Sequence, residues 1–216
     1  MPDADLIRLT PAHSKAAVET IVQAFYNDVL WRYLLPVDEA LYNVAIRSIM
    51  GFPVRHGARY GEVYATSPAM EGVAVWRTPN TPKLGLIGSV RGGAFDIITV
   101  WFRLGRHTVR RLMETADRIQ KAHARHAPGP HYYLEVIGVH PDHQGMGLGS
   151  RLMAPMLARA DSERLPCYLE TQTESNVAFY QKRGFEVVEV MDLPNGGPRG
   201  WLMLRPPPPP DQTRNA

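Results

Sequence analysis

The residues best suited to chemistry form a short glycine-rich run in the second half of the chain. Gln144, Gly147 and Gly149 form the pattern Gln-x-x-Gly-x-Gly directly after VIGVHPDH, and residues 150–160 then have a composition typical of a helix. Glycine has no Cβ, so its backbone N–H groups can approach a ligand closely, and the positive end of a following helix attracts anions. The pattern therefore predicts a cradle for a pyrophosphate group.

Two other phosphate-binding motifs fit this stretch less well. A P-loop requires Gly-Lys-Ser/Thr, and no lysine stands at that position. A dinucleotide fingerprint is matched by Gly145 and Gly147, with Glu170 about twenty residues further on. However, Ser150 occupies its third glycine position, and little chain follows Glu170 for a doubly wound sheet. A nucleotide-dependent oxidoreductase is therefore the weaker alternative.

The elements on either side of the glycine run also have a clear pattern. Residues 132–139 are rich in aromatic and β-branched residues, which favours a strand. A second apolar strand is expected at 167–171, followed by a short helix. In that helix Asn176 and Tyr180 are four residues apart, so they share one face.

Together these segments resemble the acetyl-coenzyme A signature of the GNAT superfamily of N-acetyltransferases. VAVWRTP (73–79) and GGPRGWLMLRP (196–206) extend the likeness, and the layout is similar to that of the puromycin N-acetyltransferases in this superfamily. The resemblance implies acetyl-coenzyme A as the cofactor. The residues that it would contact are Ile137, Val139, Gln144, Gly145, Met146, Gly147, Leu148, Gly149, Ser150, Asn176 and Tyr180.

The resemblance also implies catalytic roles. Tyr180 matches the family's acid, and a tyrosine with a pKa of about 10 stays protonated at neutral pH and can donate to a departing thiolate. For the base that deprotonates the amine, Glu135 is the first choice and Glu170 the second; either could instead be a salt-bridge partner. If the strand 132–139 bulges at Gly138 and splays from the strand 167–171, the backbone amides of 137–139 would be exposed. They could then bind pantetheine and the thioester carbonyl.

Aromatic residues in the N-terminal half are the candidate acceptor contacts. In the family, the region between the first two helices overlies the acceptor site. This implies contacts from Phe25, Tyr26, Trp31 and Tyr33, to which Trp76 and Tyr133 are added, although these rings could simply pack the core. The acceptor stays open between an antibiotic-like molecule, a polyamine, an amino acid and a protein N-terminus, with a small-molecule amine preferred. A module that binds acyl-coenzyme A without turnover is the alternative function.

The resemblance implies a single α/β domain of GNAT-like fold, with a mixed, mostly antiparallel sheet flanked by helices, and the remaining pattern agrees with it. A helix should start after Thr10-Pro11, and Gly51 and Pro53 should break a second one. Ser175 is expected to cap the helix of Tyr180, and Gly184 to end it. The expected segments are strand 6–9, helix 38–50, hairpin 62–66 and 72–77, a helical insertion within 84–127 and a closing hairpin of 186–192 with 201–204.

Composition limits the remaining function classes. The chain has 216 residues, of which 24 are basic and 21 acidic, and this near balance implies no nucleic-acid partner. We interpret the basic stretch 103–125 as a solvated helix face. Its single cysteine, Cys167, excludes an internal disulfide and fits the cytoplasm. We expect no signal peptide, no membrane span and no metal site among the histidines at 123, 126, 131, 140 and 143.

We therefore expect an acetyltransferase domain over 1–205, with its cofactor-binding half at about 131–185. The proline-rich segment 206–216 should form a flexible tail. A homodimer is an open expectation.

Overall fold

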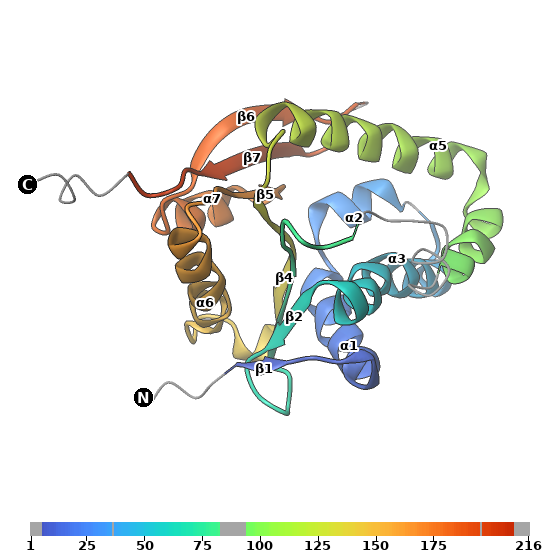
Figure 1. The fold of residues 1–216 in the computed structure, drawn as a ribbon. Coiled ribbons are helices and arrows are strands. Elements are labelled where there is room, and N and C mark those ends of the chain that lie inside the picture. Colours follow the sequence, from blue (N-terminus) through green and yellow to red (C-terminus); the bar gives the residue numbers. More distant parts are fainter. Residues whose placement is uncertain (1–5, 36, 83–93, 195, 210–216) are drawn as a thin grey trace, which may run out of the picture.

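A mixed β-sheet forms the centre of the molecule (Figure 1). The computed structural model describes residues 6–35, 37–82, 94–194 and 196–209, without the side chains of 94–97 and 99. Within these residues the sheet has seven strands in the order β1-β2-β3-β4-β5-β7-β6. All neighbours are antiparallel except β4 and β5, which are parallel. The strands are β1 (Ile7–Arg8), β2 (Glu62–Ala65), β3 (Gly72–Arg77), β4 (Tyr132–Val139), β5 (Cys167–Thr171), β6 (Glu186–Asp192) and β7 (Arg199–Arg205).

Helices cover both faces of this sheet, which confirms the predicted fold class. One face carries α1 (Ser14–Phe25), α2 (Val29–Leu34), α3 (Glu39–Tyr60) and α5 (Ala94–His126), with the 3-10 turn η1 (Pro11–His13) before α1. The other face carries α6 (Leu148–Ser162) and α7 (Glu174–Gln181), and the turn η2 (Pro141–His143) leads toward α6. The sheet is therefore the middle of three layers.

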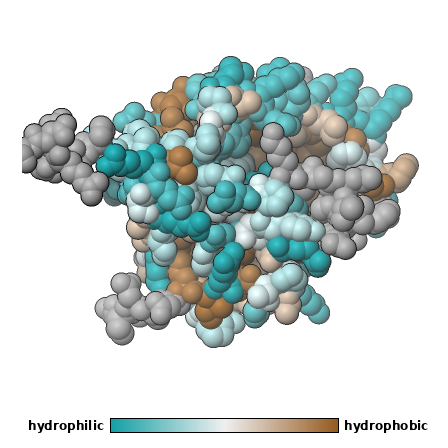
Figure 2. All heavy atoms as spheres, in the orientation of Figure 1, coloured by the Kyte–Doolittle hydropathy of each residue, from teal (hydrophilic) through white to brown (hydrophobic). Residues whose placement is uncertain are grey.

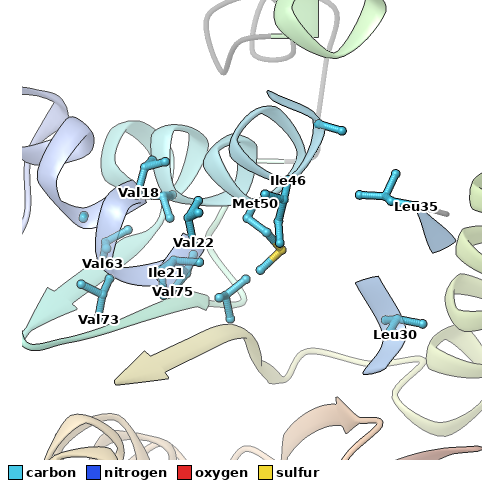
Figure 3. Packing of buried hydrophobic residues seen from close by; sticks show 14 of the residues in the cluster. Val18, Ile21, Val22, Leu30, Leu35, Ile46, Met50, Val63, Val73 and Val75 are labelled. Atoms are coloured by element: carbon cyan, nitrogen blue, oxygen red, sulfur yellow. The ribbon is translucent and has the colours of Figure 1, made fainter. Parts of the chain in front are cut away.

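The two faces of β3 belong to different cores, because successive side chains of a strand point to opposite sides. Val73 and Val75 pack with Ile21 of α1 and Ile46 of α3 in the first core (Figure 3). The alternate residues of β3 face α6 in the second core, where Leu152, Met153 and Met156 are fully or almost fully buried. The strand is consequently fixed from both sides.

The observed α3 corrects the expected helix break. It continues to Tyr60 through Gly51 and Pro53, with Met50, Val54 and Gly57 buried. A proline inside a helix costs about 3 kcal/mol. Here the burial of the helix face against α1 and the sheet offsets that cost.

Smaller differences occur at other element ends. Asp28 caps the short helix α2, which lies in an aromatic stretch that has no helical period. Thr173, not Ser175, is the N-cap of α7, and α6 starts at Leu148 rather than at residue 150. Strand β5 and strand β6 have the expected bounds.

The helix α5 consists of two helical segments that meet at Gly105, whose φ of 74° and ψ of 153° are not helical. Hydrophilic residues cover the upper edge of the molecule along its second segment (Figure 2). Lys121 pairs with Asp117, and Arg125 pairs with Glu189 of β6. Most basic residues of this segment thus lie on a solvated helix face, whereas Arg111 is partly buried and lies over the Tyr33 ring.

Parts of two predicted segments lie outside the described residues, namely 84–93 of the insertion and 210–216 of the proline-rich tail. No helix in the described part of the chain combines the length and the apolar character needed to cross a membrane.

Candidate active site

The two parallel strands at the centre of the sheet separate soon after they begin. β4 and β5 pair only at Tyr132 with Cys167 and at Tyr133 with Tyr168. The N–H of His140 donates to Glu71 on the β3 side, so by alternation the N–H groups of Ile137 and Val139 point into the gap. The expected splay is therefore present, and it exposes strand amides to a ligand.

The bulge in β4 lies at Glu135 rather than at Gly138, which corrects the predicted position. Val75 pairs with Val136 and Trp76 pairs with Leu134, so Glu135 is the extra residue. Gly138 serves packing instead, because a Cβ there would lie 2.8 Å from the Cβ of Ala24 in α1. The bulge interrupts the regular alternation of side chains along β4 and so changes the direction of the Glu135 side chain.

The glycine run forms an open loop at the start of α6. Gly145 and Gly147 have φ values of 78° and 79°, and a Cβ at either would meet no atom within 4 Å. Gly147 is the N-cap of α6, and no side chain caps the helix. Because the first N–H groups of a helix have no intrahelical partners, this loop fits a pyrophosphate group.

Neighbouring side chains hold this loop in place. The Gln144 side-chain amide donates to the Val139 carbonyl at 3.1 Å. Arg183 donates to the Ser150 hydroxyl, and a Cβ on Gly149 would lie 3.2 Å from the Phe179 ring. Met146 is 67% exposed and Leu148 is partly buried. The predicted cofactor residues 144–150 thus form one loop and the first turn of α6, next to the gap between β4 and β5.

A cavity of about 410 Å³ opens beside the splayed strands. Its walls come from β4, β5 and α7 on one side, and from α1, α2, α3 and α5 on the other. Ile137, Asn176 and Tyr180 line it together with Glu135 and Glu170. The structure therefore brings residues predicted for the cofactor, the acid and the base to one space.

Tyr180 is buried, and burial raises the pKa of its hydroxyl to about 12. Its ring packs edge-on against Phe179 and Phe185. Asn176 lies one turn earlier and donates to the Thr171 hydroxyl at 3.4 Å. The Tyr180 phenol consequently stays protonated at neutral pH.

Glu170 is the more buried of the two candidate bases, with 8% of its side chain exposed. Burial raises the pKa of its carboxyl group to about 7, although the Tyr133 hydroxyl, which donates to Oε2 at 2.8 Å, lowers it. Its other oxygen, Oε1, is buried without a hydrogen bond. Such a carboxylate is well suited to accept a proton near neutral pH.

Glu135 has a different environment. Its carboxylate accepts from Arg77 Nε at 2.8 Å and also from Arg77 Nη2, so both oxygens are engaged in one ion pair. Such a bidentate guanidinium–carboxylate pair fixes the Glu135 carboxylate in one orientation. Glu170, which has no such pair among the described contacts, is therefore the less constrained of the two carboxylates, and the choice of the base stays a prediction.

Comparison with known proteins gives the family. Residues 104–185 match the model of the acetyltransferase (GNAT) family. A crystal structure of a histone acetyltransferase and related acetyltransferase from Corynebacterium glutamicum has the same fold, with a TM-score of 0.65 at 20% sequence identity over 95% of this chain and 97% of that one. Residues 104–185 therefore match the GNAT family in sequence, and the chain as a whole has the fold of that acetyltransferase structure.

Two relatives are similar in sequence. An uncharacterized N-acetyltransferase of Schizosaccharomyces pombe is 25% identical over 177 residues, which cover 79% of this chain and 70% of the relative. An uncharacterized protein of Mycobacterium leprae is 32% identical over 82 residues, 37% of this chain but 23% of its own length. The chain thus spans less than a quarter of the Mycobacterium protein.

Three of the predicted acceptor residues line the cavity, namely Phe25, Trp31 and Tyr133. Tyr26 does not line it: its hydroxyl donates to Glu39, and its ring packs edge-on against Tyr42. Trp76 is fully buried in the second core, because its position on β3 directs the indole toward α6. These two rings therefore act in packing.

Other wall residues were not anticipated. Trp101, Leu112 and Ile119 reach the cavity from α5, and Ile49 and Pro53 reach it from α3. The apolar period of 109–119 signals a buried face, but the sequence alone does not indicate that this face looks onto a cavity.

The histidines do not form a metal site in the described part of the chain, where no group of three or more His, Cys, Asp or Glu side chains could hold an ion. His123 and His131 contact each other near Glu170 instead.

Proposed function

We propose that this chain transfers an acetyl group from acetyl-coenzyme A to the primary amine of a small molecule. The observation that carries the proposal is that Glu170 and Tyr180 line one cavity beside the β4–β5 gap. One group is a buried carboxyl with a raised pKa, and the other is a buried phenol that stays protonated. Amide formation needs both, because one proton must leave the amine and another must reach the leaving group.

The residues around the gap would hold acetyl-coenzyme A by its two ends. The N–H groups of Ile137 and Val139 would pair with pantetheine as with an added strand, and the 145–150 loop would bind the pyrophosphate at the start of α6. When bound, acetyl-coenzyme A supplies an activated thioester with a thiolate as the leaving group. Asn176 and Tyr180 face this region from α7.

The protein groups then have distinct tasks. Glu170 would take a proton from the attacking amine, and Tyr180 would give its phenolic proton to the departing sulfur. Glu135 would stay paired with Arg77 and would position the bulge of β4. Two separate groups can thus perform the proton transfers without exchanging roles.

The wall of the cavity supports an amine with an apolar body. Phe25, Trp31, Leu34, Trp101 and Leu112 contribute aromatic and aliphatic surface. The acidic residues of the lining are Glu135 and Glu170 at the sheet and Asp28 at the start of α2. Apolar walls with a few polar groups are typical of small-molecule sites. We propose a cytoplasmic enzyme of this kind, supported by the single buried cysteine.

The proposal is tested by mixing the protein with acetyl-coenzyme A and a panel of amines, and by measuring free thiol and acetylated product. The panel contains 2-phenylethylamine, puromycin, spermidine, an amino acid amide and a short peptide. Cys167 is buried and its thiol pKa is raised to about 12, so it adds little to the thiol signal.

We expect turnover to be fastest with 2-phenylethylamine or puromycin, which carry aromatic groups. Turnover with spermidine alone would contradict the apolar acceptor. Tight binding of acetyl-coenzyme A without product from any amine would favour a non-catalytic binding module.

A further inference from the structure

A pair of histidines lies next to Glu170, one on α5 and one just before β4. His123 comes from the last turns of α5, and its Nδ1 lies 3.9 Å from Glu170 Oε1, the oxygen without a hydrogen bond. His123 Nε2 lies 2.7 Å from His131 Nε2, just before β4. The three side chains therefore form a row that begins at the proposed base.

The hydrogen bonds define which nitrogen carries each proton. His131 Nδ1 lies 2.7 Å from the Gly129 carbonyl, which can only accept, so Nδ1 of His131 is protonated. In neutral His131 the other nitrogen, Nε2, then accepts from His123 Nε2–H. This leaves the lone pair of His123 Nδ1 directed toward Glu170.

The surroundings keep the row in place and lead it outward. The His123 ring stacks on Tyr168 with centroids 4.3 Å apart and planes 20° apart, and it also contacts Tyr133. Exposure rises from 8% for the Glu170 side chain to 22% for that of His123, and His131 is partly exposed as well. The row thus connects a buried carboxyl group with solvent.

The burial and the charged groups around the row favour a neutral His123 ring at rest. Burial, together with His131 and Arg77, lowers the pKa of His123 to about 4. The charged and titratable groups that surround the row come from three strands: Arg77 of β3, Tyr133 and Glu135 of β4, and Tyr168 of β5. Arg125 and His126, which lie next to the row on α5, pair instead with Glu189 of β6. A neutral His123 can pass a proton on without retaining it.

We propose that His123 and His131 carry the proton of Glu170 to solvent after each transfer, an inference that rests on the proposed role of Glu170 as the base. The O–H bond of Glu170 breaks as an N–H bond forms at His123 Nδ1. The Nε2 proton of His123 moves to His131 Nε2, and His131 loses its Nδ1 proton to water. The net result is that one proton passes from Glu170 to water, and no oxidation or reduction occurs. Each ring ends in its other tautomer and must return to the starting tautomer by proton exchange with water before the next turnover.

This route has a reason in the architecture. With both substrates bound, the cavity would be filled, and a proton on Glu170 would have no short path to water through it. The distance from Oε1 to Nδ1 must shorten by about 1 Å for a hydrogen bond, as catalytic contacts commonly do when substrates bind. The histidines provide a route that leaves the substrates in place.

The first test uses nuclear magnetic resonance of the histidine nitrogens in the protein without substrates. We expect the Nε2–H form of His123 and the Nδ1–H form of His131 at pH 7. The nitrogen shifts of His123 should change as Glu170 titrates near pH 7, and this change should be absent in Glu170→Gln. The opposite tautomer of His123, or no response to Glu170, would overturn the relay.

The second test is kinetic and uses His131→Ala, His123→Phe and the control His126→Ala, with 2-phenylethylamine as the acceptor. His123→Phe retains the stacked ring on Tyr168 without its nitrogens. We expect kcat to fall roughly tenfold or more in both relay variants with unchanged KM values, and imidazole to restore His131→Ala. His126→Ala should keep the wild-type kcat.

The outcomes separate the two proposals. If Glu170→Gln is inactive while both relay variants keep full kcat, Glu170 stands as the base and the relay is wrong. If His131→Ala is slow but imidazole restores nothing, the histidine only positions its neighbours. If Glu170→Gln itself keeps wild-type turnover, the base assignment and the relay both fail.

Discussion

Glu135 and Glu170 have the same side chain, but the sheet places them in opposite environments. Glu135 lies at the bulge of β4, within reach of the Arg77 guanidinium on β3. Glu170 lies on β5 among Tyr133 and the ring of His123, where no guanidinium pairs with it among the described contacts. The chemical difference between the two residues therefore comes from their neighbours on adjacent strands.

The first prediction concerns this difference. Because Glu170 must be deprotonated to act and burial raises its pKa to about 7, kcat/KM should rise as the pH increases through about 7. Glu170→Gln should lower kcat/KM by roughly 10² to 10⁴-fold and remove this pH dependence.

The matched control is Glu135→Gln, assayed over the same pH range. It should keep the rise near pH 7, even if loss of the Arg77 pair lowers the overall rate. If instead Glu135→Gln removes the pH dependence and Glu170→Gln keeps it, the roles of the two glutamates are exchanged.

Tyr180 gives the second prediction at this scale. Burial raises the pKa of its hydroxyl to about 12, so the wild-type rate should not decline as the pH rises to about 10. Tyr180→Phe removes only the hydroxyl and should lower kcat by about 10²-fold or more with little change in KM. An unchanged kcat in steady-state assays would exclude the acid role.

At the scale of elements, the start of α6 makes a prediction about cofactor binding. Gly147→Glu would place a carboxylate in the open space that we assign to the pyrophosphate. Calorimetry should then detect no binding of acetyl-coenzyme A, because of steric overlap and charge repulsion.

The control for backbone strain is Gly196→Glu, in the turn between β6 and β7. Gly196 has a φ of 72° and no atom within 4 Å of an added Cβ, so both variants carry a similar cost of roughly 1–2 kcal/mol. Gly196→Glu should bind acetyl-coenzyme A normally. Equal loss in both variants would attribute the effect to folding.

The gap between β4 and β5 makes a second prediction at this scale. If pantetheine pairs with β4, acetyl-coenzyme A should slow hydrogen exchange at the Ile137 and Val139 amides, which point into the gap. The Gly138 amide faces β3 and serves as the internal reference. Protection at Gly138 alone, measured by nuclear magnetic resonance, would contradict this mode of binding.

At the scale of the whole molecule, the cavity joins distant parts of the chain. Trp31→Ala removes an aromatic wall from α2, and a buried aromatic group contributes on the order of 2 kcal/mol, so KM for 2-phenylethylamine should rise about 30-fold. KM for acetyl-coenzyme A should stay unchanged. Tyr26→Phe, outside the cavity wall, should leave both KM values at the wild-type level. If Trp31→Ala raises only the KM for acetyl-coenzyme A, the assignment of Trp31 to the acceptor wall is refuted.

Much of the fold follows from local sequence patterns, and much of the site does not. The glycine loop, β5 and the shared face of Asn176 and Tyr180 depend on neighbouring residues, so the sequence predicts them well. The Arg77–Glu135 pair joins residues that are 58 positions apart, and it decides which glutamate is free. Likewise, the direction of Trp76 depends on which face of β3 meets α6.

The walls of the cavity come from two sources with different freedom to change. The gap, the loop and α7 lie within residues 104–185, whereas Phe25, Trp31 and Ile49 come from the N-terminal helices outside that range. Substitutions in α1 to α3 can therefore reshape the acceptor end while the cofactor end keeps its geometry. For protein engineering, these helices are the natural place to redirect such a chain to new amines, one ring at a time.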